Sequence, residues 1–202
     1  MIYINEGDFV RMITTLILVV ITLAIIIAIY RTYVEIVKKR NNVQEAMSGI
    51  DVQLNKRYSL IPNILTIAQK FMEHEKELLV GITELRSRAA ALKPADENNM
   101  QEKIKLDNEI SSKMSQLLVN VENYPQLKSD QTMIQAMQTY AETEEHIAAS
   151  RRFYNSAAKD LNNSVQIFPS SIIASLIGIK EYPFFEANDE IRKEINASDY
   201  LK

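Results

Sequence analysis

The chain contains no cysteine and no tryptophan, and it has only four glycines and five prolines in 202 residues. Without cysteine it cannot form disulfides, thiolate metal sites, iron–sulfur clusters or a thiol nucleophile. Few glycines and prolines provide little material for the turns of a sheet protein, whereas Leu, Ile, Ala, Glu, Lys, Gln and Met favour helices and are plentiful. We therefore expect an all-α protein.

A strong charge of either sign is also lacking, because the formal net charge is −3 at pH 7. No basic block is long enough to suggest a nucleic-acid surface, so we expect no nucleic-acid partner. A phosphate-binding loop needs clustered glycines, and no such cluster exists. The four glycines are isolated from one another: Gly7, Gly49, Gly81 and Gly178.

Enzyme motifs are scarce as well. A di-iron helical bundle requires Glu-x-x-His on two helices, but Phe71 precedes His74 by three residues and Thr143 precedes His146 by three. There is no G-x-S-x-G turn for a serine nucleophile. We predict a non-enzymatic protein with no catalytic residue, no cofactor, no metal and no evident small-molecule substrate.

One long apolar run is present at the N-terminal end. Residues 12–30, between Arg11 and Arg31, carry no charged side chain. About 20 apolar residues cross the hydrocarbon core of a bilayer. A cleaved secretory signal is the alternative, but its apolar region usually has 7–15 residues and precedes a small-x-small cleavage site, which is missing here. We predict an uncleaved transmembrane helix over 12–30, preceded by a short N-terminus over 1–11.

The charges on either side of this run predict its orientation. Arg11 lies before it, near Glu6 and Asp8, whereas the basic residues after it are Arg31, Lys38, Lys39 and Arg40. Cytoplasmic flanks of membrane helices carry an excess of Lys and Arg. We expect the N-terminus to lie outside and the C-terminal domain in the cytoplasm.

Apolar residues recur every three or four positions through 31–168, which is typical of long amphipathic helices. The pattern stops around 89–99, at Pro125 and at Pro169. Pro62 leaves two alternatives, because the pattern continues across it as in a kinked helix, yet Ser59 could cap a new helix. We favour the break. Four helices of similar length then form an antiparallel up-down bundle with coiled-coil-like packing.

Charged residues interrupt these apolar stripes. Four of them occupy positions that face the bundle interior: Arg57, Glu75, Glu144 and Arg151. They could form a polar network that serves a ligand or switch, or buried ion pairs that fix the helix register. We favour ion pairs, since buried pairs more often specify an arrangement than supply a function.

Residues 169–187 form an apolar and aromatic segment, followed by a polar tail over 188–202. The apolar run is too short to span a bilayer. It could lie at the membrane interface or fold back to cap the bundle, and we favour capping because large apolar patches seldom stay exposed. The residues concerned are Ile172, Ile173, Leu176, Ile177, Tyr182, Phe184 and Phe185.

Several motifs occur in order along the chain. They are Arg40-Asn41-x-Val43, Ser48-x-Ile50-Asp51-Val52-Gln53-Leu54-x-Lys56-Arg57-Tyr58-x-Leu60-Ile61-Pro62-Asn63, Glu122-x-Tyr124-Pro125-x-Leu127-Lys128, Glu144-x-x-Ile147-Ala148-x-x-Arg151-x-x-Tyr154-Asn155, Phe168-Pro169-Ser170 and Phe184-Phe185-Glu186-Ala187. In these motifs the chain resembles the LemA family, nearly throughout the region after the apolar run. It departs from the family pattern at Met47, Leu161 and Thr132-Met133, where Trp, Tyr and Asn-Phe are common.

The resemblance implies a single-pass protein of the bacterial cytoplasmic membrane with a helical bundle and no established active site. Members of the family often neighbour a membrane-bound zinc metalloprotease in the genome, and one branch belongs to magnetosome membranes. We expect a non-enzymatic scaffold or adaptor, held in the lipid bilayer by 12–30, that binds protein partners or forms a homo-oligomer. The alternatives are a regulatory factor for membrane proteolysis or envelope stress and, less favoured, an enzyme that uses the Arg/Glu network.

Overall fold

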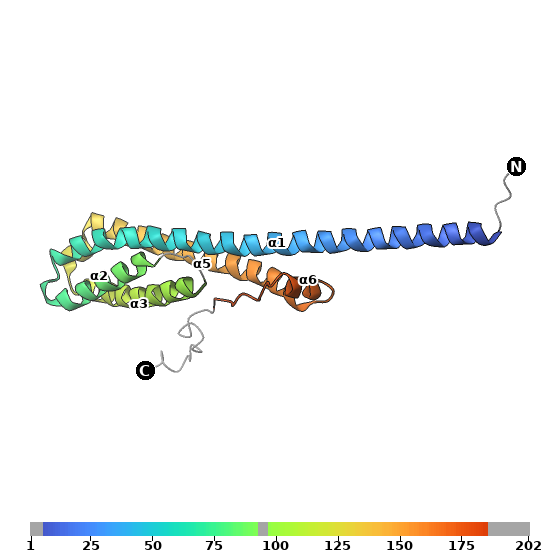
Figure 1. Cartoon of the computed structure of the whole chain (residues 1–202). Helices are drawn as coiled ribbons and strands as arrows, with labels where there is room; N and C mark the ends of the chain where they lie inside the picture. The colour runs from blue at the N-terminus through green and yellow to red at the C-terminus, as the bar shows by residue number, and fades with distance from the viewer. Residues whose placement is uncertain (1–5, 93–96, 186–202) are drawn as a thin grey trace, which may run out of the picture. The chain divides into compact units, whose positions relative to one another are not determined.

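The computed structural model describes residues 6–92 and 97–185, and within these ranges the regular structure is entirely helical (Figure 1). The prediction of an all-α protein is confirmed. The predicted polar tail over 188–202 lies outside the described residues, as does part of the predicted N-terminus. The elements are α1 (Glu6–Gln69), the short 3-10 helix η1 (Glu73–Glu75), α2 (Lys76–Ala91), α3 (Glu97–Val121), α4 (Pro125–Lys128), α5 (Gln131–Gln166) and α6 (Ser170–Leu176).

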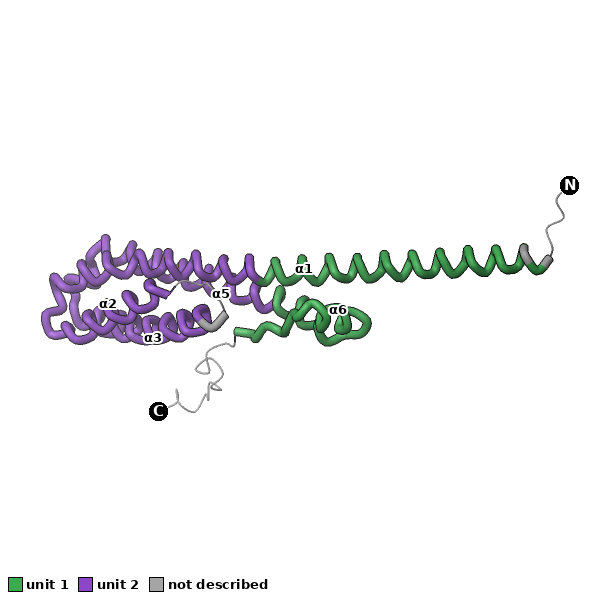
Figure 2. Tube along the Cα trace, viewed as in Figure 1, with its two compact units in different colours: residues 1–43, 156–202 green, residues 44–155 purple. Residues whose placement is uncertain are grey.

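The chain divides into two compact units, coloured separately in Figure 2. The first unit comprises residues 1–43 and 156–202, and the second comprises residues 44–155. Helices α1 and α5 each contribute to both units, since each crosses a boundary without a break. The two units are described one at a time below.

In the first unit, none of the described residues packs over the apolar run in the N-terminal part of α1. Residues 12–30 are all exposed. Among the described residues, α1 is the one helix that is long and apolar enough to cross a membrane. The polar side chains of this run are satisfied locally, because the Thr14 hydroxyl donates to Arg11 O at 2.9 Å and the Thr22 hydroxyl donates to Leu18 O at 2.8 Å. The run therefore presents an apolar surface that suits lipid, and its backbone polar groups are hydrogen-bonded within the helix.

In the second unit, the apolar stripes of the sequence form the core. Helix α2 packs against α3, and α1 and α5 contribute the other buried faces. Burying large aliphatic side chains of this kind stabilises a fold by about 1.5–3 kcal/mol each. The residues with no exposed area are Ile50, Leu54, Ile61, Ile64, Ala68, Ile82, Ala89, Met100, Ile110, Leu117, Leu127 and Tyr154.

Helix α1 continues through Pro62, so the predicted break before it is wrong. A proline has no N–H, and inside a helix this leaves the carbonyl four residues earlier without its usual donor. Here that carbonyl belongs to Tyr58, and Arg86 Nε of α2 donates to it at 3.1 Å. The Ser59 hydroxyl, which we expected to cap a new helix, instead donates back to Lys56 O at 2.6 Å. The compensating donor comes from another helix, where sequence periodicity could not show it.

The first turn away from α1 lies further along the chain than predicted. Backbone bonds from Phe71 and Met72 to Ala68 O close the end of α1, and η1 follows before α2 begins at Lys76. Met72 is buried within this turn. The helix that contains the membrane-length run thus reaches well into the core of the second unit before the chain first reverses.

Candidate functional site

Arg57 is the largest fully buried side chain of the second unit, with a relative exposure of 1%. It follows Leu54 by three residues and precedes Ile61 by four, so helical periodicity places all three on the core face of α1. A buried guanidinium is costly unless it is paired and its hydrogen bonds are satisfied. Its partners therefore define a candidate site.

Those partners come from α3 and α5. Arg57 Nη1 donates to Asp107 Oδ2 at 2.9 Å, and Nη2 donates to Ser111 Oγ at 2.7 Å and to the Tyr140 hydroxyl at 2.6 Å. Nη2 also lies 2.7 Å from Glu144 Oε2, and the guanidinium carbon lies 4.6 Å from the centroid of the Tyr140 ring. One side chain thus joins three helices through charge-assisted hydrogen bonds and a cation–π contact.

A second guanidinium lies near the same carboxylate oxygen of Asp107. Arg151 Nη2 is 3.6 Å from Asp107 Oδ2 and donates to Asn108 Oδ1 at 3.4 Å. Arg151 is partly exposed, and the Glu144 side chain is half exposed, whereas Asp107 is buried. The buried pair at the centre is therefore flanked by charges that reach solvent. We call Arg57, Asp107, Tyr140, Glu144 and Arg151 the Arg57 cluster.

Burial dominates the electrostatics of this cluster. Burial raises the pKa of Asp107 above its ordinary value, and the nearby Arg57 and Arg151 only partly offset that effect. Burial likewise raises the pKa of Tyr140 to about 12. For Arg57, burial lowers the pKa, but the charge of Asp107 and the contacts with Tyr140 and Glu144 more than compensate, so the net pKa is raised. The guanidinium is therefore held as a permanent cation.

A second buried cation lies nearby in the same unit. Lys103 of α3 has a relative exposure of 1%, and its Nζ donates to Asp51 Oδ1 at 2.6 Å, to Asn55 Oδ1 at 3.1 Å and to Leu92 O at 3.2 Å. It also lies 5.7 Å from the centroid of the Tyr58 ring. The three ammonium donors are thus used in joining α3 to α1 and to the end of α2.

The structure brings together three of the four residues predicted to form a polar network. Arg57, Glu144 and Arg151 meet around Asp107. Glu75 lies elsewhere, in η1, which has no buried residue, so its assignment to the bundle interior is wrong. The periodicity failed there because the helix that it assumed had already ended at Gln69.

Asp107, Tyr140 and Lys103 were missed by the sequence analysis, although each left a signal. Asp107 lies midway between Ile104 and Ile110 on the stripe of α3, a charged gap of the same kind as Arg57. Tyr140 occupies an apolar stripe position, so its hydroxyl was not counted as a partner. Lys103 adjoins Ile104 and follows Met100 by three residues, and only the fold shows that it faces inward.

The C-terminal apolar residues predicted to cap the bundle or contact the membrane lie in or after α6. Capping does not describe four of them, because Ile172, Leu176, Ile177 and Phe184 are exposed. The other three, Ile173, Tyr182 and Phe185, are half-buried. The buried residue of α6 is Ala174, so the helix packs through this small side chain while Ile172 and Leu176 face outward.

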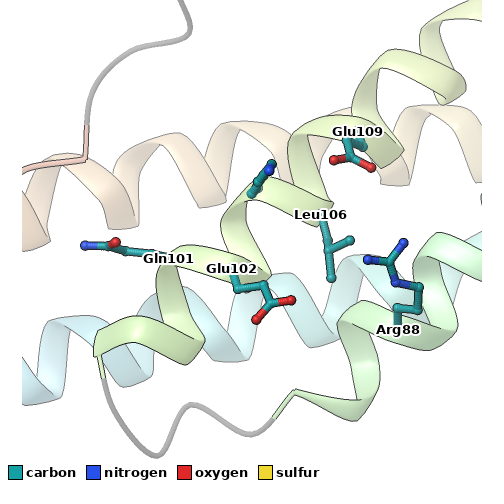
Figure 3. Close-up of a pocket in the computed structure, with 6 residues that line it drawn as sticks. Arg88, Gln101, Glu102, Leu106 and Glu109 are labelled. Atoms are coloured by element: carbon teal, nitrogen blue, oxygen red, sulfur yellow. The ribbon is translucent and has the colours of Figure 1, made fainter.

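A surface pocket of about 490 Å³ lies between α2 and α3 in the second unit (Figure 3). Arg88 of α2 points toward α3, which supplies the other lining residues, among them Glu102, Leu106 and Glu109. None of the residues that line it belongs to the Arg57 cluster. Within 6–92 and 97–185, no group of three His, Asp or Glu side chains is arranged to hold a metal ion.

Comparison with known proteins identifies the family. The model of the LemA family matches residues 46–198. Protein LemA of Metamycoplasma hominis is 23% identical over 165 residues, which cover 82% of this chain and 74% of that protein. Magnetosome proteins MamQ 1 and MamQ 2 of Paramagnetospirillum magneticum are each 30% identical over 80 residues, covering 40% of this chain and 29% of each relative. The family match covers both buried cations and α6, and the chain belongs to the LemA family.

Proposed function

We propose that this protein is a non-enzymatic scaffold or adaptor, anchored in the cytoplasmic membrane by residues 12–30, whose helical domain binds a protein partner or a second copy of itself. In this proposal the C-terminal domain lies in the cytoplasm and its long helices form an antiparallel up-down bundle. The basic residues that follow the apolar run support the orientation.

The observation that carries the proposal is that charged residues of the family motifs form buried bonds between helices. Arg57 and Asp107 are each about 1% exposed, and Arg57 bonds to side chains of α3 and α5. A catalytic group must reach its substrate, but the central pair of this cluster is closed off by the helices that it joins. Such a cluster suits a device that fixes helix register better than one that performs chemistry.

The continuity of α1 supports a function at the membrane. The helix that carries the exposed apolar run also carries Arg57, without a break between Glu6 and Gln69. A domain attached in this way stays near the membrane surface, where its partners should be sought.

Photo-crosslinking of the full-length protein in its native membrane would test the proposal. A photoreactive amino acid at exposed positions of α5, such as Gln135 or Gln138, should give a discrete cross-linked species. The detergent-solubilised protein should also exceed the monomer mass if the partner is a second copy. A strictly monomeric protein with no cross-linked species at any exposed position would contradict a scaffold.

The orientation is testable separately because the chain has no native cysteine. A Gly7→Cys variant should react with a membrane-impermeant maleimide in intact cells, since a Cβ at Gly7 meets no atom within 4 Å. A Gln135→Cys variant should react only after lysis. The reverse pattern would place the domain outside the cytoplasm.

A further inference from the structure

The last helix of the first unit, α6, has an apolar face that the described residues of that unit leave exposed. Ile172 is 54% exposed and Leu176 is 80% exposed. The two are four residues apart and therefore share one face of the helix, whereas the buried Ala174 lies two residues from each, on the opposite face. The exposed apolar residues around them in the chain are Ile167, Phe168, Ile177 and Phe184.

Hydrogen bonds define the backbone conformation at the C-terminal end of α6. Gly178 has φ +70°, a conformation that a side chain would strain. Its N–H donates to Ser175 O at 3.2 Å, and the next N–H, that of Ile179, donates to Ala174 O at 3.0 Å. This pair of bonds is the Schellman motif that ends many helices.

The chain beyond α6 is tied back to α5. Asn162 Nδ2 donates to Tyr182 O at 2.8 Å, and the Tyr182 N–H donates to Asn162 Oδ1 at 2.9 Å. This reciprocal pair holds the segment after α6 against the end of α5. With its C-terminal end held in this way, α6 keeps Ile172 and Leu176 on its exposed face.

The same unit places this segment close to the end of the apolar run. Lys39 Nζ of α1 donates to Ser164 Oγ of α5 at 2.8 Å, and α6 begins six residues after Ser164. All of residues 12–30 are exposed. Thr32 is the first partly buried residue after them, and Ile36 is the first buried one, with 1% of its surface exposed. At about 1.5 Å per residue, Ile36 lies about 9 Å beyond Tyr30 along the helix.

The start of this covered stretch corresponds to the headgroup layer, because Thr32 lies about 3 Å beyond Tyr30 along the helix. A bilayer of about 40–45 Å with a hydrocarbon core of about 30 Å has a polar layer of about 5–8 Å on each side. If residues 12–30 fill the core, Thr32 lies within this layer and Ile36, which is 1% exposed, lies just beyond it. An apolar helix face close to this layer is typical of interfacial helices.

We propose that the apolar face of α6, formed by Ile172 and Leu176 with Phe168 and Ile177 beside them, inserts into the headgroup and upper acyl region of the bilayer as a second membrane contact. This proposal goes beyond the scaffold function. It requires the anchor over 12–30 but no protein partner. The exposed apolar side chains of α6 then contact the same bilayer that residues 12–30 span.

Fluorescence quenching in vesicles of the full-length protein would test the proposal. Single cysteines at Leu176, Lys159 and Leu23 can each carry an NBD fluorophore, since the chain has no other cysteine. The vesicles would contain phosphatidylcholine and phosphatidylglycerol, with a lipid that carries a nitroxide at its headgroup or on its acyl chain. We expect quenching of about twofold or more at Leu176→Cys from the headgroup nitroxide.

The controls bracket this result. Lys159→Cys, on an exposed position of α5 in the same unit, should be quenched little. Leu23→Cys should be quenched by the acyl-chain nitroxide, which verifies the anchor independently of α6. If Leu176→Cys matches Lys159→Cys while Leu23→Cys is quenched, the proposal is wrong and the anchor stands. If Leu176→Cys is shielded only at high protein-to-lipid ratio and without lipid quenching, α6 contacts a second copy and the proposal is also wrong.

A charge on the face provides an independent check. Ile172→Asp should reduce the quenching at Leu176→Cys at least about twofold, because a carboxylate resists entry into the interface. The matched control is Ile134→Asp, on an exposed position of the second unit with a similar exposed fraction. It should leave the quenching unchanged. If both variants fold and the two substitutions change the quenching at Leu176→Cys equally, the proposal is wrong.

Discussion

The two units of this protein place their polar and apolar side chains in opposite ways. In the second unit, Arg57, Lys103 and Asp107 are each about 1% exposed. In the first unit, Leu16 and Leu18 of α1 are more than 60% exposed, and Leu176 of α6 is 80% exposed. A water-surrounded fold cannot keep so much apolar surface outside at low cost, whereas a lipid-surrounded helix can.

This contrast occurs within a single helix, so secondary structure does not cause it. Helix α1 carries both the exposed apolar run and the buried Arg57. The environment of each stretch decides which residues suit it. In the core, charges are tolerated because partners from α3 and α5 surround them, and in the apolar run large side chains are tolerated because a bilayer can take the place of water.

The largest expected effect comes from removing the central cation of the core. Arg57→Met leaves Asp107 buried without its nearest partner, and breaking a buried pair in this way costs about 3–5 kcal/mol. Urea unfolding of the full-length protein in detergent, followed by circular dichroism, measures the loss. Arg152→Met, at an exposed position of α5, is the matched control and should change the free energy of unfolding by less than about 0.5 kcal/mol.

The double variant Arg57→Met/Asp107→Asn sharpens this test. Neutralising Asp107 removes the uncompensated buried charge, so much of the stability lost in Arg57→Met should return. If Arg57→Met is as stable as the unchanged protein, the cluster does not hold the three helices together.

A charge placed in the apolar run should have the next largest effect. A lysine at the centre of a membrane helix costs about 2.5–3.5 kcal/mol of insertion free energy. Ile21→Lys should therefore lower the fraction of protein that resists carbonate extraction. The same substitution at Ile134, which is also exposed but lies in the second unit, should leave that fraction unchanged. If both substitutions lowered the extraction-resistant fraction equally, the apolar run would not be the part of the chain that holds the protein in the membrane.

The buried hydroxyl of Tyr140 should make the core sensitive to alkali. Its pKa in the folded protein is about 12, against about 10 for an unfolded tyrosine, so the unfolded chain ionises first. Stability is therefore unaffected below pH 10 and is lost as pH rises through 12. Relative to Tyr140→Phe, the unchanged protein should lose up to about 3 kcal/mol over this window, measured by urea unfolding at each pH. Identical pH profiles for the two proteins would show that Tyr140 ionises freely.

The smallest expected effect concerns the continuity of α1 at Pro62. Arg86→Leu leaves the Tyr58 carbonyl without its donor and should cost about 1–2 kcal/mol. In a Pro62→Ala background the new backbone N–H can serve the same carbonyl, so the cost of Arg86→Leu should shrink. Arg88→Leu, at an exposed position of α2, is the control. Additive effects of Arg86→Leu and Pro62→Ala would contradict the compensation.

The sequence by itself determined the helical class, the membrane-length run over 12–30 and most core positions, because these properties depend on local spacing and hydropathy. It also marked Arg57, Glu144 and Arg151 as charges on the core stripes. The family signature was likewise readable as residues in order along the chain.

Only the tertiary structure decided how these pieces meet. The partners Asp107 and Tyr140 lie 50 and 83 residues from Arg57, and Arg86 lies 28 residues from the carbonyl that it serves. Periodicity along one helix cannot report a donor that another helix supplies, which is why the break at Pro62 was wrongly predicted. Glu75 was misplaced because periodicity alone did not show that α1 ends at Gln69. The outward face of α6 is also visible only in the fold, which buries Ala174 and leaves Ile172 and Leu176 exposed.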